Sequence, residues 1–337
     1  MKKAGLYLLC IAFALGCNNK KIPNVSNIKV NVTLQRFEND FFSIDTTNID
    51  QALQSLHQKY PVFLQDFIFN ILALPPQPDS SAALKQGIVS FIQSYKAIKA
   101  DGDKAFKSMD EVQQQIKKGM QFVKYYFPNY KLPGKIITFV GPVNSYGNIL
   151  TRDALAVGLQ LYMGSDYPLY QSQQGQELYP AYISRRFNKE YIPVNCMKNI
   201  VHDMYPDNTT GKPLIEQMIE AGKKLYLLDA LLPRTADTLK TGYTKDQLDG
   251  CFKNEELIWS FFVQNDLLYA TDPGLIKDYM NDAPNTAVLG QASPGFIGQF
   301  VGWRIVSKWM DKNENISPPE LMKKNPRTIF NEAKYKP

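Results

Sequence analysis

The segment from Asn195 to Leu232 constrains the fold most, because it predicts two helices separated by residues that end helices. Apolar residues recur at helical spacing on both sides of the break. They are Met197, Ile200, Val201 and Met204 before it, and Leu214, Met218, Ile219, Leu225 and Leu228 after it. Pro206, Asn208 and Gly211 lie between the two runs, where they favour a loop. The segment is therefore expected to form a helix, a loop and a second helix.

Polar residues on these helices have the layout of a zinc peptidase site. Lys198, Asn199 and His202 have the spacing of an H-E-x-x-H motif, in which two histidines bind zinc and the glutamate activates water. Glu220 follows His202 by 18 positions, close to where a third, carboxylate ligand would come from a second helix. The layout alone is a loose pattern, since it contains one histidine and one glutamate.

The residue types at these positions do not fit zinc chemistry. An ammonium such as that of Lys198 cannot bind Zn²⁺ unless it loses its proton, and the amide of Asn199 cannot accept a proton from water near neutral pH. The whole chain contains only two histidines, His57 and His202. We therefore expect no metal, no cofactor and no catalytic residue, and we interpret Lys198, Asn199, His202 and Glu220 as a candidate degenerate cleft. The alternative is a pair of ordinary core helices with His202 hydrogen-bonded or at the surface.

The first residues have the pattern of a lipoprotein leader. Lys2 and Lys3 precede an apolar run that is too short to span a bilayer, and Gly16 precedes Cys17, as in a bacterial lipobox. We predict a signal peptide over residues 1–16 and lipid attachment at Cys17, where several acyl chains would hold the protein firmly on a membrane. The alternative is an ordinary cleaved leader followed by an incidental cysteine.

The residues after Cys17 predict where the lipoprotein resides. Residues 17–27 are polar and form a tether. Asn18 is not the aspartate that often retains lipoproteins in an inner membrane, and no acidic run follows it that would favour export to the outer surface. We therefore expect the periplasmic face of the outer membrane.

Composition indicates one exported globular domain over residues 28–337. Hydrophobic residues make up 44% of the chain, enough for a sizeable core. The net charge of +6 falls to +4 when Lys2 and Lys3 leave with the leader, too small and scattered for a nucleic-acid-binding surface. Cys196 and Cys251 would remain, either bridged or as free buried thiols.

The remaining patterns place the chain among α+β folds, mostly helical with a small sheet. Helices are expected at residues 49–60, 80–98, 110–126, 244–268 and from 295 onward, and strands at 28–34, 136–140, 149–150 and 155–162. Gly295, Gly298 and Gly302 lie on one side of the last long helix and predict close approach by a neighbour. Arg185 and Arg186 could bind a carboxylate or phosphate, although an isolated pair more often forms ion pairs.

Several long segments resemble the GldB family of gliding-motility lipoproteins. They are FPNYKLPGKIITFVGP, LQLYMGSDYPLY, YPAYISRRFNKEYI, LIEQMIEAGKKLYLLDALLP, SPGFIGQFVGWRIV and RTIFNEAKYKP, and they extend over nearly the whole chain after the lipobox. The segments EAGKKLY and PGFIGQFVGWRIV are also similar, more distantly, to predicted zinc proteases. In that comparison only His202 and Glu220 match, whereas Lys198 and Asn199 depart from the motif.

These resemblances imply a function and a fold. The GldB likeness implies a non-enzymatic envelope lipoprotein required for gliding, which acts with protein partners in the gliding and type IX secretion machinery. The zinc-protease likeness implies a degenerate zincin-like fold. The alternatives are a zinc-dependent peptidase and a module that binds a peptide or glycan in the cleft.

Overall fold

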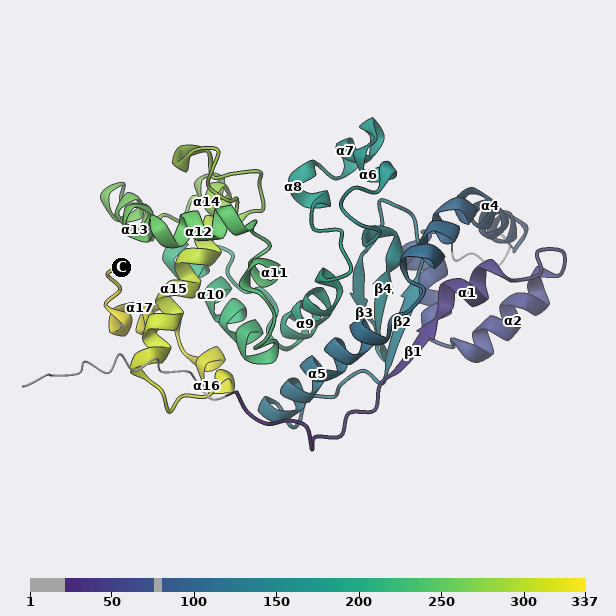
Figure 1. The fold of residues 1–337 in the computed structure, drawn as a ribbon, viewed down its shortest axis with the longest axis horizontal. Helices are drawn as coiled ribbons and strands as arrows, with labels where there is room; N and C mark the ends of the chain where they lie inside the picture. The colour runs from purple at the N-terminus through teal and green to yellow at the C-terminus, as the bar shows by residue number, and fades with distance from the viewer. Residues whose placement is uncertain (1–21, 76–80) are drawn as a thin grey trace, which may run out of the picture.

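A four-stranded mixed sheet separates two helical layers, and a larger group of helices follows it in the chain (Figure 1). The computed structural model describes residues 22–75 and 81–337. The predicted leader and Cys17 lie outside the described residues. The described part is mostly helical with a small sheet, as the α+β prediction requires.

The sheet has the strand order β1-β2-β4-β3. Its strands are β1 (Thr33–Arg36), β2 (Lys135–Phe139), β3 (Asn148–Leu150) and β4 (Ala154–Gly158). β1, β2 and β4 pair in parallel, whereas β3 pairs antiparallel with β4 and forms one edge.

The strand predicted over residues 28–34 was wrong for its first part, because strand structure begins only at Thr33. Side chains of the helix α5 (Asp110–Tyr126), which is remote in sequence, bind the backbone there instead. The Gln121 amide donates to the carbonyl of Ile28 at 2.9 Å, and the Gln113 amide donates to the carbonyl of Val32 at 3.4 Å. The alternating apolar residues thus reflect an extended segment that is held by a helix.

Successive residues of the strands face two different cores, as the period of a strand requires. Ile137 and Phe139 contact an aromatic cluster that contains Phe37 and Phe67, whereas Ile136 faces the main core. The aromatic layer contains α1 (Phe37–Phe42), α2 (Ile49–Lys59), α3 (Phe63–Gln65), the π-helix η1 (Asp66–Ile71) and α4 (Ser81–Ala105). The other layer contains α5 (Asp110–Tyr126) and α9 (Tyr191–Met204), which lie on the opposite side of the sheet (Figure 1).

Short helices connect the sheet to α9, and a helical group follows. The connecting elements are η3 (Leu159–Leu161), α6 (Pro168–Gln171), α7 (Gln173–Leu178) and α8 (Ala181–Ser184). The helical group contains α10 (Leu214–Leu231), α11 (Asp237–Thr241), α12 (Lys245–Lys253), α13 (Glu255–Gln264), η4 (Leu267–Tyr269), α14 (Pro273–Met280), η5 (Ala287–Leu289), α15 (Ile297–Lys312), α16 (Pro318–Lys323) and α17 (Pro326–Ala333). In residues 22–75 and 81–337, no helix is both long and apolar enough to cross a bilayer.

The single helix predicted over residues 244–268 is broken in two at Asn254, since α12 ends at Lys253 and α13 begins at Glu255. A capping box begins α12, with Gln247 N donating to the Thr244 hydroxyl at 3.1 Å. Leu257, in the first turn of α13, is 69% exposed. Cys196 and Cys251 are both buried free thiols, so the bridged alternative is not realised.

The two longest helices of the C-terminal group, α10 and α15, meet backbone to backbone. A Cβ atom added to Gly222 would lie 2.1 Å from the carbonyl carbon of Gly302, and one added to Gly302 would lie 1.6 Å from the carbonyl oxygen of Met218. Real Cβ atoms do not approach other atoms so closely. The predicted close approach at Gly302 is confirmed, and its partner is α10.

The crossing predicts a large effect of one methyl group. Gly302→Ala should lower the free energy of unfolding by about 3 kcal/mol, because the helices must separate to admit the Cβ atom. Gly250→Ala is the matched control within α12, where an added Cβ meets nothing within 4 Å. It should raise stability by up to about 1 kcal/mol through helix propensity. Urea unfolding checks both, and equal midpoints for the two variants would contradict the tight crossing.

Candidate functional site

All four residues of the predicted degenerate cleft line one cavity. Lys198, Asn199 and His202 project from α9, and Glu220 projects from α10, into a space of about 600 Å³. The side chains one helical turn apart on α9 share a face, which explains why Lys198 and His202 meet the same space. Asn281, which follows α14, and Gln299 of α15 also line the cavity.

Lys198 is the unusual residue of this cavity. Its side chain is half-buried and has no hydrogen bond or ion pair to any of the described residues. Burial lowers the pKa of the Lys198 ammonium to about 8, and the nearby Arg186 cation lowers it further, whereas Asp282 opposes both effects. Because burial without a partner disfavours its charge, Lys198 is a candidate for binding or chemistry rather than for stability.

Glu220 is engaged by a neighbouring cation. The Lys223 ammonium, only 2% exposed, lies 3.1 Å from Glu220 Oε2 and donates to the carbonyl of Lys324 at 2.9 Å. Burial lowers the pKa of Lys223, and the charge of Glu220 opposes that shift. The Glu220 carboxylate therefore helps to satisfy the buried ammonium that attaches α16 to α10.

His202 lies at the solvent-exposed rim of the cavity. Its side chain is 63% exposed, and its Nδ1 lies 3.7 Å from Asp207 Oδ2. Asp207 also forms an ion pair with Lys224, which lines the same cavity. Within residues 22–75 and 81–337, no group of three or more His, Cys, Asp or Glu side chains could hold a metal ion.

A second cavity of about 350 Å³ shares Lys198 and Asn199 with the first. It extends from α9 to the start of β3, where three polar side chains are linked. Asn195 Nδ2 donates to Tyr162 Oη at 2.8 Å, and that hydroxyl donates to Asn148 Oδ1. Sequence reasoning missed Asn148 and Tyr162, because nothing in the local pattern indicates that β3 and η3 lie beside α9.

The arginine pair makes ordinary structural contacts. Arg186 forms an ion pair with Asp282, and Arg185 donates to the carbonyl of Gly242 at 2.6 Å. Burial lowers the pKa of the Arg185 guanidinium, which is also close to Arg186. Neither arginine is a free clamp for a carboxylate, and Lys198 remains the cation of the second cavity without an ion-pair partner in the described part of the chain.

The fold and the two neighbouring cavities define a mostly helical α+β protein whose cleft is lined by lysine and amide side chains together with His202, Asp207 and Glu220. The chain matches the family described as gliding motility protein GldB over residues 18–337. It therefore belongs to the GldB family. No curated protein and no solved structure matches it.

The lowered pKa of Lys198 predicts a pH-dependent gain in stability on its replacement. At neutral pH, Lys198→Met should raise the free energy of unfolding by about 1 kcal/mol, less than the full pKa shift implies because the side chain keeps solvent contact. Between pH 8 and 10.5 the unfolded chain binds the Lys198 proton and the folded chain does not, so the wild type gains stability as the pH rises. The difference between the proteins should therefore shrink over that range.

Chemical unfolding of both proteins across pH 7 to 11 measures this difference directly. Lys224→Met is the control, because Lys224 is paired with Asp207 at the same cavity. A Lys198→Met protein that is less stable than the wild type at pH 7 would contradict the unfavourable burial of this ammonium.

Proposed function

We propose that this protein is a lipid-anchored, non-enzymatic component of the gliding apparatus that acts with the type IX secretion machinery. The observation that carries the proposal is the match to a gliding motility family over almost the entire chain. The leader pattern supports the anchoring, since residues 1–16 have the order of a lipoprotein signal peptide and Cys17 follows Gly16.

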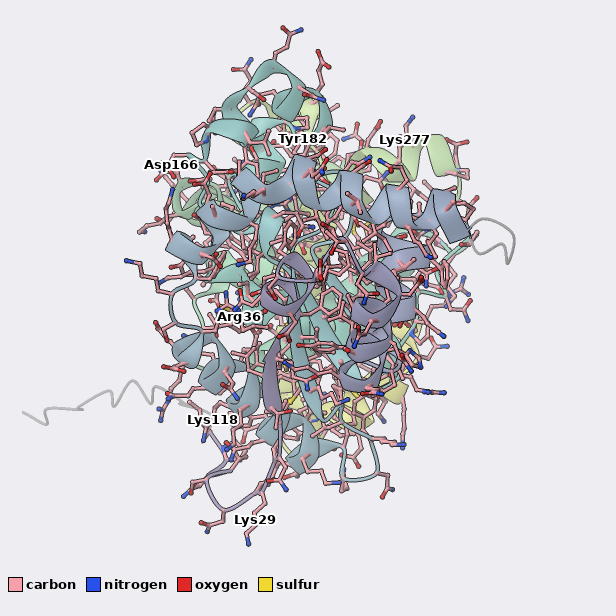
Figure 2. All side chains as sticks on the ribbon, turned by 90° about the vertical axis from the view of Figure 1, so that its right-hand side faces the viewer. Lys29, Arg36, Lys118, Asp166, Tyr182 and Lys277 are labelled. Atoms are coloured by element: carbon pink, nitrogen blue, oxygen red, sulfur yellow. The ribbon has the colours of Figure 1, made fainter. Side chains whose placement is uncertain are left out.

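In this proposal residues 17–27 tether one globular domain, residues 28–337, to the periplasmic face of the outer membrane. Figure 2 places Lys29 at one end of the molecule and Tyr182, between α6 and α9, toward the other. Val25 is buried in the main core, so the free part of the tether ends before it, and we propose that the end of the molecule near Lys29 faces the bilayer. The helices α6, α7 and α8 would then point away from the membrane, toward partners in the envelope (Figure 1).

We further propose that the cleft is a zincin-like pocket that has lost its metal and now binds a peptide or an envelope polymer. Asn199, His202 and Glu220 would supply its polar contacts. Three features argue against hydrolysis there. Lys198 occupies the motif position of a metal ligand, and Glu220 neutralises Lys223. The position expected for a catalytic base holds an amide.

Anchoring can be tested by comparing two cysteines of the leader region. Cys17→Ala should abolish acylation and spreading on agar, because the mature protein would lose its only predicted lipid. Cys10→Ala is the matched control and should leave both intact, since Cys10 lies within the predicted signal peptide. Metabolic labelling with a radioactive fatty acid and colony spreading are the measurements. Normal gliding by a Cys17→Ala strain would refute the tether.

A zinc peptidase is the competing function, and the meeting of His202 and Glu220 in one cavity favours it. Elemental analysis of the purified protein separates the two. Our proposal expects no stoichiometric zinc and the same content in His202→Ala and Glu220→Ala. Stoichiometric zinc that disappears in either variant, together with chelator-sensitive peptide cleavage, would establish the peptidase instead.

A further inference from the structure

The outer side of β3 is an edge of the sheet with unpaired backbone groups. Gly158 N donates to the carbonyl of Gly147 at 2.7 Å, and Thr151 N donates to the carbonyl of Ala154 at 2.8 Å, so residues 147, 149 and 151 bond toward β4. The backbone groups of alternate residues in an antiparallel ladder point in opposite directions. The N–H and C=O groups of Asn148 and Leu150 therefore point outward, and none of them has a hydrogen-bond partner in residues 22–75 or 81–337.

Cavities lie on both faces of this edge. The cavity that contains Lys198 reaches Gly147 and Asn148 on the α9 side. Another cavity, of about 680 Å³, is lined by Ile149 and Leu150 together with Asp66 of the π-helix η1. Ile149 packs against the aromatic cluster, which places this cavity on the opposite side of the sheet. An added strand would send alternate side chains into the two spaces.

The two spaces differ in charge. Arg186 and Lys198 are the charged residues that line the cavity on the α9 side, and no carboxylate lines it within the described part of the chain. Arg186 already forms an ion pair with Asp282, so Lys198 is the cation that a carboxylate of a ligand could pair with. The opposite cavity is lined by charges of both signs, Asp66 and Arg152, and by apolar side chains such as Ile149.

We propose that β3 binds an extended polypeptide segment as an additional strand, with an acidic side chain of that segment against Lys198 and its apolar side chains in the opposite cavity. Main-chain hydrogen bonds to Asn148 and Leu150 provide affinity in this mode, and the side-chain spaces provide selectivity. The inference rests on the proposed role of the cleft as a binding site and names the class of ligand. Sheets also use very short edge strands to prevent pairing with other chains and aggregation. The cavities on both sides of β3 favour a binding role here, because they have room for the side chains of an added strand.

The test uses the full-length lipoprotein in detergent and a fluorescent heptapeptide of alternating Glu and Val, with anisotropy as the readout. The same peptide with Lys in place of Glu should bind at least about tenfold more weakly, because its charges repel Lys198. Two further peptides carry N-methyl groups on all Glu or on all Val amides. One of the two should lose at least about tenfold in affinity and the other much less, since only alternate amides of an added strand face β3.

Protein variants test the same contacts from the other side. Leu150→Pro removes an outward N–H without removing a bond to β4, so the sheet should persist, as proline is tolerated at sheet edges. Binding of the Glu/Val peptide should fall at least about tenfold. Lys198→Met should weaken binding of the Glu/Val peptide by about tenfold but leave binding of its Gln/Val analogue unchanged. This comparison still tests the inference if Leu150→Pro fails to fold.

Equal binding of both N-methylated peptides, no measurable binding of any peptide, or full binding by folded Leu150→Pro would overturn the inference. Binding of an oligouronate glycan in the cleft, without binding of any of the peptides, would overturn it as well, since a glycan does not pair with a strand edge. These results are independent of gliding, because binding is measured on purified protein. A Cys17→Ala strain that glides normally would instead refute only the anchoring.

Discussion

The crossing of α10 and α15 at Gly222 and Gly302 holds the C-terminal half of the molecule in place. Without side chains between them, the two backbones come close enough that Met218 O contacts the Cα side of Gly302. α10 also contacts α5, α9, α16 and α17, so a shift of α10 would change the packing of these helices. A residue larger than glycine at either position would displace α10 and with it the wall of the cleft.

Different sides of α10 contact α15, the cavity and α16. Met218 and Gly222 face α15, whereas Gln217, Glu220 and Lys224 face the cavity. Lys223 lies between these faces and reaches the end of α16. Since residues three and four apart share a face of a helix, small shifts in α10 would move the packing residues and the cavity residues together. The architecture therefore couples the stability of the C-terminal helices to the shape of the cleft.

Local patterns predicted the parts of the fold that depend on local physics. The apolar period of α5 gave Asp110–Tyr126 with Val112 and Ile116 buried, and the Thr244 capping box fixed the start of α12. The break at Asn254 was not predictable, because the apolar pattern continues across it. The four cleft residues were chosen from a motif spacing on α9, and they do line one cavity, but the contact of Lys223 with the carbonyl of Lys324 depends on where α16 ends. Asn148 and Tyr162 were missed for the same reason, since their neighbours are remote in sequence.

The charge of the cleft determines what kind of ligand it can favour. A metal site concentrates anionic or neutral donors around a cation, whereas this cleft contains the ammonium of Lys198 and pairs the carboxylate of Glu220 with Lys223. Burial without a partner destabilises the ammonium, so the arrangement lowers stability when the cleft is empty. A carboxylate that arrives with a ligand would remove this penalty, and the binding free energy would include the gain. We therefore propose that the cleft accepts an anion and that the edge of β3 beside it supplies the hydrogen bonds that would hold that anion on an extended chain.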